Sequence, residues 1–169
     1  MASRYGVEPN EIVGSGTSRD YLLALAEGAT RVLDVGCSTG GLAAALMARG
    51  AHVVGLDIDA EAVQEACDRG VDARVVDLES SSLSAAMEHE TFDCVIFGDV
   101  LEHLVDPGGV LAESRAVLAP EGCVLVSIPN VANASVCLAL LTNRWDGREI
   151  GLLDRTHLRF FTLDSFLDM

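Results

Sequence analysis

Short apolar runs alternate with helical stretches along this chain. The spacing predicts helices with Ala- and Leu-rich faces between the runs, such as one that Gly50 closes and one from Pro107 to Leu118. The apolar runs are Arg31–Val35, 51–58, 72–78, Phe92–Gly98 and 122–128. Strands that are apolar on both faces and separated by helices form parallel sheets covered on both sides. We therefore expect an α/β fold, a doubly wound, Rossmann-like, mainly parallel sheet with helices on both faces.

Helical segments are also predicted before and after these five strands. Residues 18–27 form one of them, and residues 162–169 read as the start of another, with Thr162 as its N-cap. We expect one domain over residues 1–169, with a helical segment at 1–30 and a ligand-binding core at 31–130. Polar residues beside the apolar LRFF sequence favour a lid over the site within residues 131–169.

Composition and charge exclude several functions. The 169 residues carry 26 acidic and 11 basic side chains, a formal net charge of −15, which disfavours nucleic acid and anionic membrane surfaces as partners. Every basic residue is Arg, so chemistry that requires a lysine is excluded. Five cysteines without a CxxC pair, and no signal or spanning segment, favour a reduced cytoplasmic setting.

The predicted strands end in groups that a nucleoside ligand needs. A glycine-rich turn, residues 36–41, follows the first strand and leads into a helix, where backbone amides are free to hold a ligand. Asp57 ends the second strand, 21 residues after Gly36, where a carboxylate binds a ribose diol. Asp77 ends the third strand, and the fourth leads into the sequence GDVLEHL. All four ends meet at the edge of the sheet where ligands bind.

Each signal also has a structural explanation. The glycine-rich turn alone is compatible with a tight loop between strand and helix, Asp77 with a helix cap, and Asp57 with an N-cap, for which Asp59 is equally well placed. It is the combination at four successive strands that favours nucleoside binding.

These segments resemble the class I S-adenosylmethionine-dependent methyltransferases. The matching sequences are VLDVGCSTGGLA, VVGLDID, VVDLES, FDCVIFGDVLEHLVDP and LAPEGCVLVSIPN, and the later GLLDRTHLRFFT is similar to a bacterial subgroup acting on small molecules. The resemblance implies S-adenosylmethionine as cofactor, with methionine near Asp34, ribose hydroxyls on Asp57 and the adenine amino group on Asp77. The residues assigned to the cofactor are Asp34, Gly36, Cys37, Ser38, Gly40, Asp57, Ile58, Asp77, Leu78, Gly98, Asp99 and Val100. Many relatives have glycine where this chain has Ser38.

Two histidines are candidates for a catalytic base. His103 follows the fourth strand at the ligand-binding edge, and His157 lies in the predicted lid. The alternative for both is that they only anchor their loops by hydrogen bonds. No grouping of His, Asp and Glu shows metal-ligand spacing, so no metal is expected. Four arginines of the last 26 residues, Arg144, Arg148, Arg155 and Arg159, are either lid groups for an acidic acceptor or partners in surface ion pairs.

The leading hypothesis is methyl transfer from S-adenosylmethionine to a small-molecule acceptor. A non-catalytic cofactor-binding fragment and an NAD-dependent oxidoreductase are the alternatives. The family's sheet usually ends in an antiparallel pair of strands, which we do not find, so we expect a chain truncated within its last helix. The fifth strand then leaves an apolar edge, which residues 131–141 or 158–161, or a second copy in a homodimer, are expected to cover.

Overall fold

The computed structural model describes residues 16–169, so the first half of the predicted N-terminal segment, residues 1–15, lies outside the described residues. Five parallel strands form one sheet in the order β3-β2-β1-β4-β5. They are β1 (Arg31–Val35), β2 (His52–Asp57), β3 (Asp72–Val75), β4 (Phe92–Gly98) and β5 (Leu118–Ser127). The order reverses next to β1, which creates a topological switch point between β1 and β4. The predicted parallel α/β sheet is confirmed.

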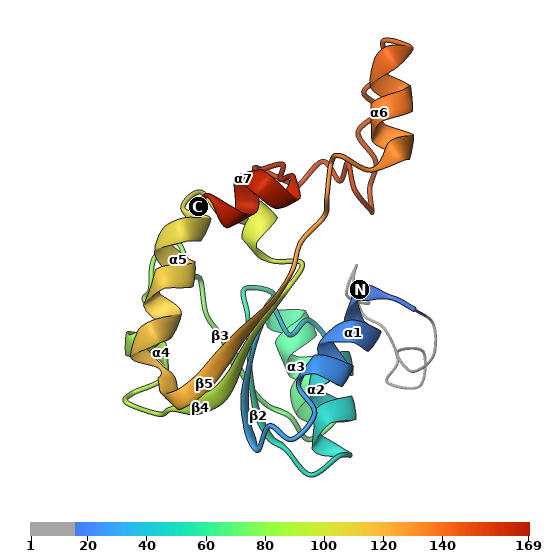
Figure 1. Cartoon of the computed structure of the whole chain (residues 1–169). Helices are drawn as coiled ribbons and strands as arrows, with labels where there is room; N and C mark the ends of the chain where they lie inside the picture. The colour runs from blue at the N-terminus through green and yellow to red at the C-terminus, as the bar shows by residue number, and fades with distance from the viewer. Residues whose placement is uncertain (1–15) are drawn as a thin grey trace.

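Helices cover both faces of the sheet (Figure 1). One face carries α1 (Ser18–Leu25), α2 (Gly41–Met47) and α3 (Ala60–Asp68), and the other carries α4 (Leu83–Ala86) and α5 (Pro107–Glu113). Alternate residues of β1 serve the two layers, because Val32 packs with the first set and Leu33 with the second. Central strands buried on both sides hold the loops at their carboxyl ends in fixed positions.

The predicted boundaries are wrong around β5. The helix predicted to reach Leu118 ends at Glu113, and a 3-10 turn, η3 (Ser114–Ala116), follows it. β5 begins at Leu118, before Pro120, and its register against β4 shifts between Phe92 and Cys94. An edge strand tolerates a proline and such an irregularity because one side forms no ladder. β3, at the other edge, ends at Val75 rather than residue 78.

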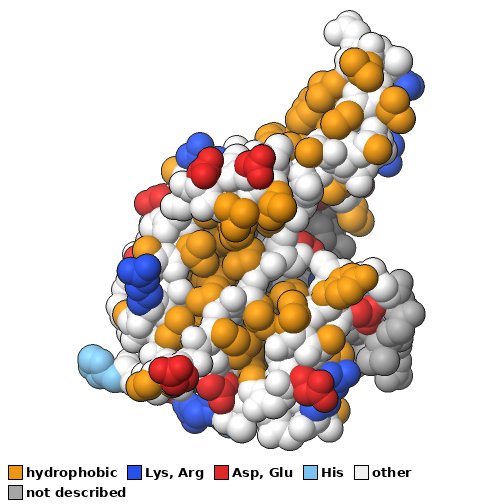
Figure 2. Space-filling model, in the orientation of Figure 1, with side chains coloured by type: hydrophobic (Ala, Val, Ile, Leu, Met, Phe, Trp, Pro, Cys, Tyr) orange, Lys and Arg blue, Asp and Glu red, His pale blue; other side chains and the backbone are white. Residues whose placement is uncertain are grey.

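The segment after β5 forms α6 (Ala134–Leu141), which projects away from the sheet (Figure 1). Leu138, Leu140 and Leu141 are exposed on it, and Figure 2 shows hydrophobic side chains along this projection. The expectation that residues 131–141 cover the edge of β5 is therefore wrong. Of residues 158–161, Phe161 forms a single bridge with Asn130, beyond the end of β5. None of the helices within residues 16–169 has the length and apolar character that a membrane crossing requires.

The last helix, α7 (Leu163–Leu167), begins as the sequence predicts. The Thr162 side chain accepts a hydrogen bond from the backbone N–H of Ser165, and the Ser165 hydroxyl in turn accepts from the backbone N–H of Thr162. This reciprocal pair is a capping box, which fixes where the helix begins.

Candidate functional site

A cleft of about 890 Å³ lies at the carboxyl ends of the strands. It is lined by residues from the ends of β1, β2 and β4, by the loop after β3, and by six residues of the predicted lid: Ile150, Gly151, Leu152, Asp154, Thr156 and His157. The sequence-predicted residues that line it are Gly36, Ser38, Asp57, Ile58, Asp77, Leu78, Gly98, Asp99, Val100, His103 and His157. Segments far apart in the sequence therefore meet at one edge of the sheet, as a parallel sheet requires.

The glycine-rich turn is held against the end of β2. The backbone N–H groups of Gly36 and Cys37 both donate to the Leu56 carbonyl, at 2.7 and 2.9 Å. Gly36 and Gly40 have a φ of +77°, which glycine adopts without strain. A Cβ on Gly36 would overlap Cγ2 of Val100, so the turn after β1 and the loop after β4 are in close contact. Ser38 itself adopts a φ of +49°, a conformation for which glycine is better suited.

Asp57 connects the end of β2 to the glycine-rich turn. Its carboxylate accepts hydrogen bonds from the backbone N–H of Ser38 at 2.8 Å and of Asp59 at 2.9 Å. Asp59 is the N-cap of α3, because its side chain accepts from the N–H groups of Glu61 and Ala62. The capping alternative for Asp57 is therefore wrong. Each Asp57 oxygen keeps acceptor capacity, and the residue lines the cleft.

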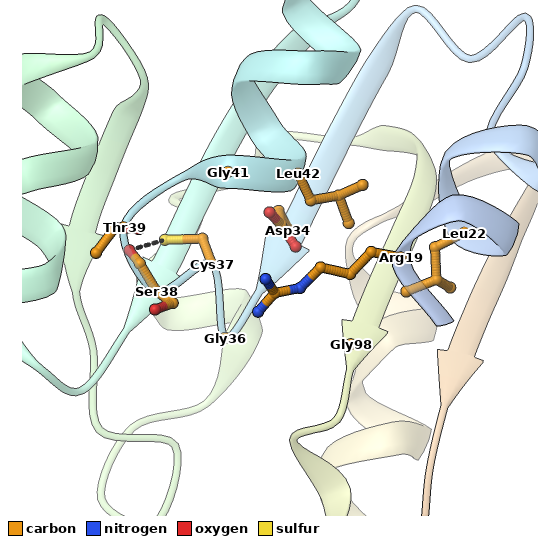
Figure 3. Close-up of a pocket in the computed structure, with 10 residues that line it drawn as sticks. All are labelled: Arg19, Leu22, Asp34, Gly36, Cys37, Ser38, Thr39, Gly41, Leu42 and Gly98. Carbon is orange, nitrogen blue, oxygen red and sulfur yellow. Dashed lines mark hydrogen bonds between the residues drawn. The ribbon is translucent and has the colours of Figure 1, made fainter. Parts of the chain in front are cut away.

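Asp34 and Arg19 form a small cavity beside the turn (Figure 3). Arg19 extends from α1 toward Asp34, with Leu22 and Leu42 on either side. Asp34 is 2% exposed, and its Oδ2 atom is buried without a hydrogen-bond partner among the described residues. Burial raises the pKa of Asp34 to about 7, against the opposing effect of the Arg19 charge. Burial also raises the pKa of the neighbouring Cys37 thiol, so this cysteine stays protonated.

The loops after β3 and β4 complete the cleft. The Asp77 carboxylate accepts from the backbone N–H of Glu79 at 2.9 Å, while Ser82 caps α4, so Asp77 is not that helix's cap. Asp99 adopts a φ of +56° and accepts from the Ser127 hydroxyl, which connects the ends of β4 and β5. Ile58 is 67% exposed and lines the cleft, so its apolar side chain is available to pack against a ligand.

A cluster of Glu102, His103 and His157 lies at the lid side of the cleft. Glu102, in the 3-10 turn η2 (Leu101–His103), is 1% exposed, and neither of its side-chain oxygens has a hydrogen-bond partner in the part of the chain that the structure describes. Its Oε1 lies 3.9 Å from Nε2 of His157. The rings of His103 and His157 meet edge to face with centroids 4.9 Å apart. The sequence predicts both histidines as candidates but not Glu102.

Burial governs the charges of this cluster. It raises the pKa of Glu102 to about 8, and the charges of Asp99 and Asp154 act in the same direction. Burial also lowers the pKa of His157, with a further contribution from His103, while Asp154 opposes the shift. Near neutral pH Glu102 is therefore largely protonated and His157 is neutral.

Residues of the predicted lid hold these side chains in place. Thr156 donates its hydroxyl to Asp154 at 2.7 Å, and its carbonyl oxygen lies 3.2 Å from Nδ1 of His103. The Glu102 carbonyl accepts from the backbone N–H groups of Leu158 and Arg159, at 2.8 and 3.0 Å. The lid segment is thereby fixed to the turn after β4.

The arginines of the lid do not line this cleft. Arg155 donates to the Gly147 carbonyl and Arg159 to the Val105 carbonyl, at 3.2 and 2.6 Å. Within residues 16–169, the arginine that lines the cleft is Arg19, which the sequence analysis missed. The arrangement thus does not support Arg155 and Arg159 as direct contacts of an acidic acceptor.

A family model described as a methyltransferase domain matches residues 15–169. The chain belongs to this methyltransferase family. The ubiquinone biosynthesis O-methyltransferase of Hahella chejuensis is 36% identical over 114 residues, which cover 66% of this chain and 48% of that protein. The SAM-bound structure of CalS10, an amino pentose methyltransferase from Micromonospora echinaspora, is 28% identical with a TM-score of 0.53, covering 65% of this chain and 47% of that one. A SAM-dependent methyltransferase from Archaeoglobus fulgidus has a TM-score of 0.66 at 18% identity, covering 89% of this chain and 66% of that one.

Membership of the methyltransferase family decides between the interpretations of the sequence. It confirms the resemblance to class I enzymes. Two of the solved relatives hold the cofactor or its product: CalS10 is bound to SAM, and the N-terminal domain of EvdMO1 is bound to SAH. Family membership also decides against the NAD-dependent alternative. The chain spans about half the length of the curated relatives it matches.

Proposed function

We propose that this methyltransferase chain binds S-adenosylmethionine in the cleft and transfers its methyl group to a small-molecule acceptor at the lid side. The observation that carries the proposal is that Asp57 and Asp77 line the cleft at the switch point of the sheet, while Asp34 lines the small cavity next to it. The cavity and the cleft share Arg19, Gly36, Ser38 and Gly98, so together they offer partners for the ammonium, ribose and adenine groups of the cofactor.

The residues present fit this cofactor. The unpartnered Oδ2 of Asp34 suits the methionine ammonium, and Arg19 beside it suits the carboxylate. Asp57 is placed for the ribose hydroxyls, Ile58 and Leu78 for the faces of the adenine ring, and Asp77 for its amino group. Cys37, Ser38 and Gly40 shape the glycine-rich turn, and Gly98, Asp99 and Val100 would bound the donor side.

The bound cofactor supplies an activated methyl group on a sulfonium. The chain's own residues then have to orient the acceptor and exclude water, since positioning provides much of the acceleration in such a transfer. The half-buried His103 and His157 line the lid side of the cleft, where either imidazole would accept the proton of an acceptor hydroxyl. The name of the curated relatives, O-methyltransferases, favours an oxygen acceptor.

The proposal extends to the organisation of the domain, its location in the cell and its pairing with a second copy. The domain would comprise the helical segment to residue 30, the cofactor core at 31–130 and the lid at 131–169, and act in the cytoplasm of a bacterium. The edge of β5, which α6 leaves uncovered, supports pairing with a second copy.

Calorimetry with S-adenosylmethionine, its product S-adenosylhomocysteine and NAD tests the proposal. We expect both sulfur ligands to bind at one site per chain and NAD not to bind. Release of homocysteine, coupled to a panel of phenolic, amine and carbon acceptors, then measures turnover. Binding of NAD alone would contradict the proposal, whereas cofactor binding without turnover on any acceptor would favour a non-catalytic binding domain.

The pKa of Asp34 predicts how cofactor affinity depends on pH. The carboxyl is neutral below its pKa of about 7 and charged above it, and only the charged form pairs with an ammonium. Affinity for S-adenosylmethionine should therefore rise severalfold between pH 6 and 8, measured by calorimetry. Asp34→Asn should bind more weakly and lose this dependence. A parallel rise in the variant would assign the effect to another group.

The raised pKa of Asp34 has the opposite effect on stability, which should fall as pH rises. Because the folded pKa lies above the unfolded value of 3.8, Asp34 contributes stability that is present below about pH 4 and is lost as pH rises toward 7. Without cofactor, thermal unfolding of Asp34→Asn should therefore show less loss of stability than the natural chain over this interval.

A further inference from the structure

Three side chains with metal-ligating atoms meet at the lid side of the cleft. Glu102, His103 and His157 each bring one such atom within 4.8 Å of the other two. His157 comes from a segment more than 50 residues beyond the other two, so no sequence spacing reveals the group. All three line the cleft, which gives an ion access to them from solvent.

The Glu102 carboxyl group lacks partners that its burial demands. Both oxygens are buried without a hydrogen bond to any residue of the described range 16–169, and the residue is 1% exposed. A buried polar group without a partner is costly, and native structures nearly always supply one. Nε2 of His157 lies 3.9 Å from Oε1 of Glu102, which is too far for a hydrogen bond. A cation held between the carboxylate and the ring would provide the missing partner.

The hydrogen bonds around His103 fix its tautomer in the form that a metal requires. The Thr156 hydroxyl gives its hydrogen to Asp154, so it offers only lone pairs to Nδ1 of His103, 3.3 Å away. The Thr156 carbonyl, 3.2 Å from the same nitrogen, is also an acceptor. Nδ1 therefore carries the proton and Nε2 carries the lone pair. Metal-binding histidines characteristically donate their other N–H to a carbonyl in this way.

We propose that Glu102, His103 and His157 form a binding site for a divalent transition-metal ion of the zinc type. Two imidazoles and one carboxylate suit zinc and its neighbours better than magnesium or calcium, which prefer oxygen ligands. Three protein ligands would leave a coordination position open, as in catalytic zinc sites, and all three side chains line the cleft. A role of that position in holding an acceptor oxygen rests on the proposed methyl transfer, but metal binding itself does not.

Zinc titration without cofactor or acceptor tests the site. The full chain is stripped with a chelator and titrated with zinc chloride in a calorimeter. We expect one equivalent to bind, and the affinity to fall at least 100-fold in Glu102→Gln and in His157→Gln. His52→Gln is the matched control, because this exposed histidine lies at the amino end of β2, and the cleft lies at the carboxyl ends of the strands. Equal affinity in His157→Gln and His52→Gln would overturn the proposal, as would the absence of stoichiometric binding by the natural chain.

Cobalt substitution distinguishes this site from the exposed thiols of Cys67, Cys123 and Cys137. Cobalt at Glu102, His103 and His157 should give visible bands without a thiolate charge-transfer band, and a strong charge-transfer band would overturn the assignment. Circular dichroism and thermal unfolding verify that each variant folds, and S-adenosylmethionine binding is measured separately. Thr156→Val provides a milder test, since loss of the hydroxyl beside His103 should weaken zinc binding about 10-fold. Because zinc affinity and cofactor affinity are read separately, failure of the metal site leaves the methyl-transfer proposal standing.

Discussion

Replacing Asp57 with Ala should weaken S-adenosylmethionine binding about 100-fold or more. The change removes the proposed acceptor of the ribose hydroxyls and leaves the Ser38 and Asp59 amides without their carboxylate. Hydrogen bonds to a charged group contribute about 1.5–3 kcal/mol each, so losing two at the ribose accounts for at least that factor. Calorimetry with S-adenosylmethionine measures the loss directly.

Asp93→Ala is the matched control for Asp57→Ala. Asp93 also accepts backbone hydrogen bonds, from the N–H groups of Thr30 and Arg31 at 2.9 and 3.1 Å. It lies near the amino end of β4, whereas the cleft lies at the carboxyl ends of the strands. Its loss should lower the free energy of unfolding by about 1–3 kcal/mol while cofactor affinity stays unchanged. If Asp57→Ala lost stability but bound the cofactor normally, its carboxylate would serve only the turn.

The cofactor side of the cleft could be predicted because it depends on strand ends. Once the sheet is parallel, Gly36, Asp57, Asp77 and Gly98 must meet at one edge, whatever the loops between them do. The same logic fails for edge strands, where neighbours constrain less. β5 therefore begins before Pro120, and β3 stops at Val75, because an edge tolerates irregular backbone on its open side.

The missed residues depend on contacts that no local pattern encodes. Arg19 reaches Asp34 only because α1 packs against the sheet beside β4 and β5, at an angle the sequence does not specify. Glu102 is buried because the lid binds its carbonyl from residues 158 and 159. The local signal for it is an acidic residue within the mainly apolar sequence VLEHLV, where the neighbouring leucines and valines favour burial.

Gly36→Ala should abolish measurable S-adenosylmethionine binding for a purely steric reason. The new Cβ would overlap Cγ2 of Val100, and the φ of +77° costs a residue with a side chain about 1–2 kcal/mol. Relieving the overlap requires the glycine-rich turn and the loop after β4 to move apart, and overpacking of this kind costs about 1–3 kcal/mol more. Both loops line the cleft. The loss in the free energy of cofactor binding should therefore exceed the loss in the free energy of unfolding that the lowered thermal midpoint indicates.

Two further variants separate the contributions to this effect. Gly28→Ala is the control for backbone strain, because Gly28 has a φ of +87° and no atom within 4 Å of the added Cβ. It should lose stability but keep cofactor affinity. Adding Val100→Ala to Gly36→Ala removes the overlapping Cγ2 atom, so the double variant should recover part of the binding, beyond the sum of the two single changes. An unaltered affinity in Gly36→Ala itself would mean that the contact between these loops is not what shapes the cofactor site.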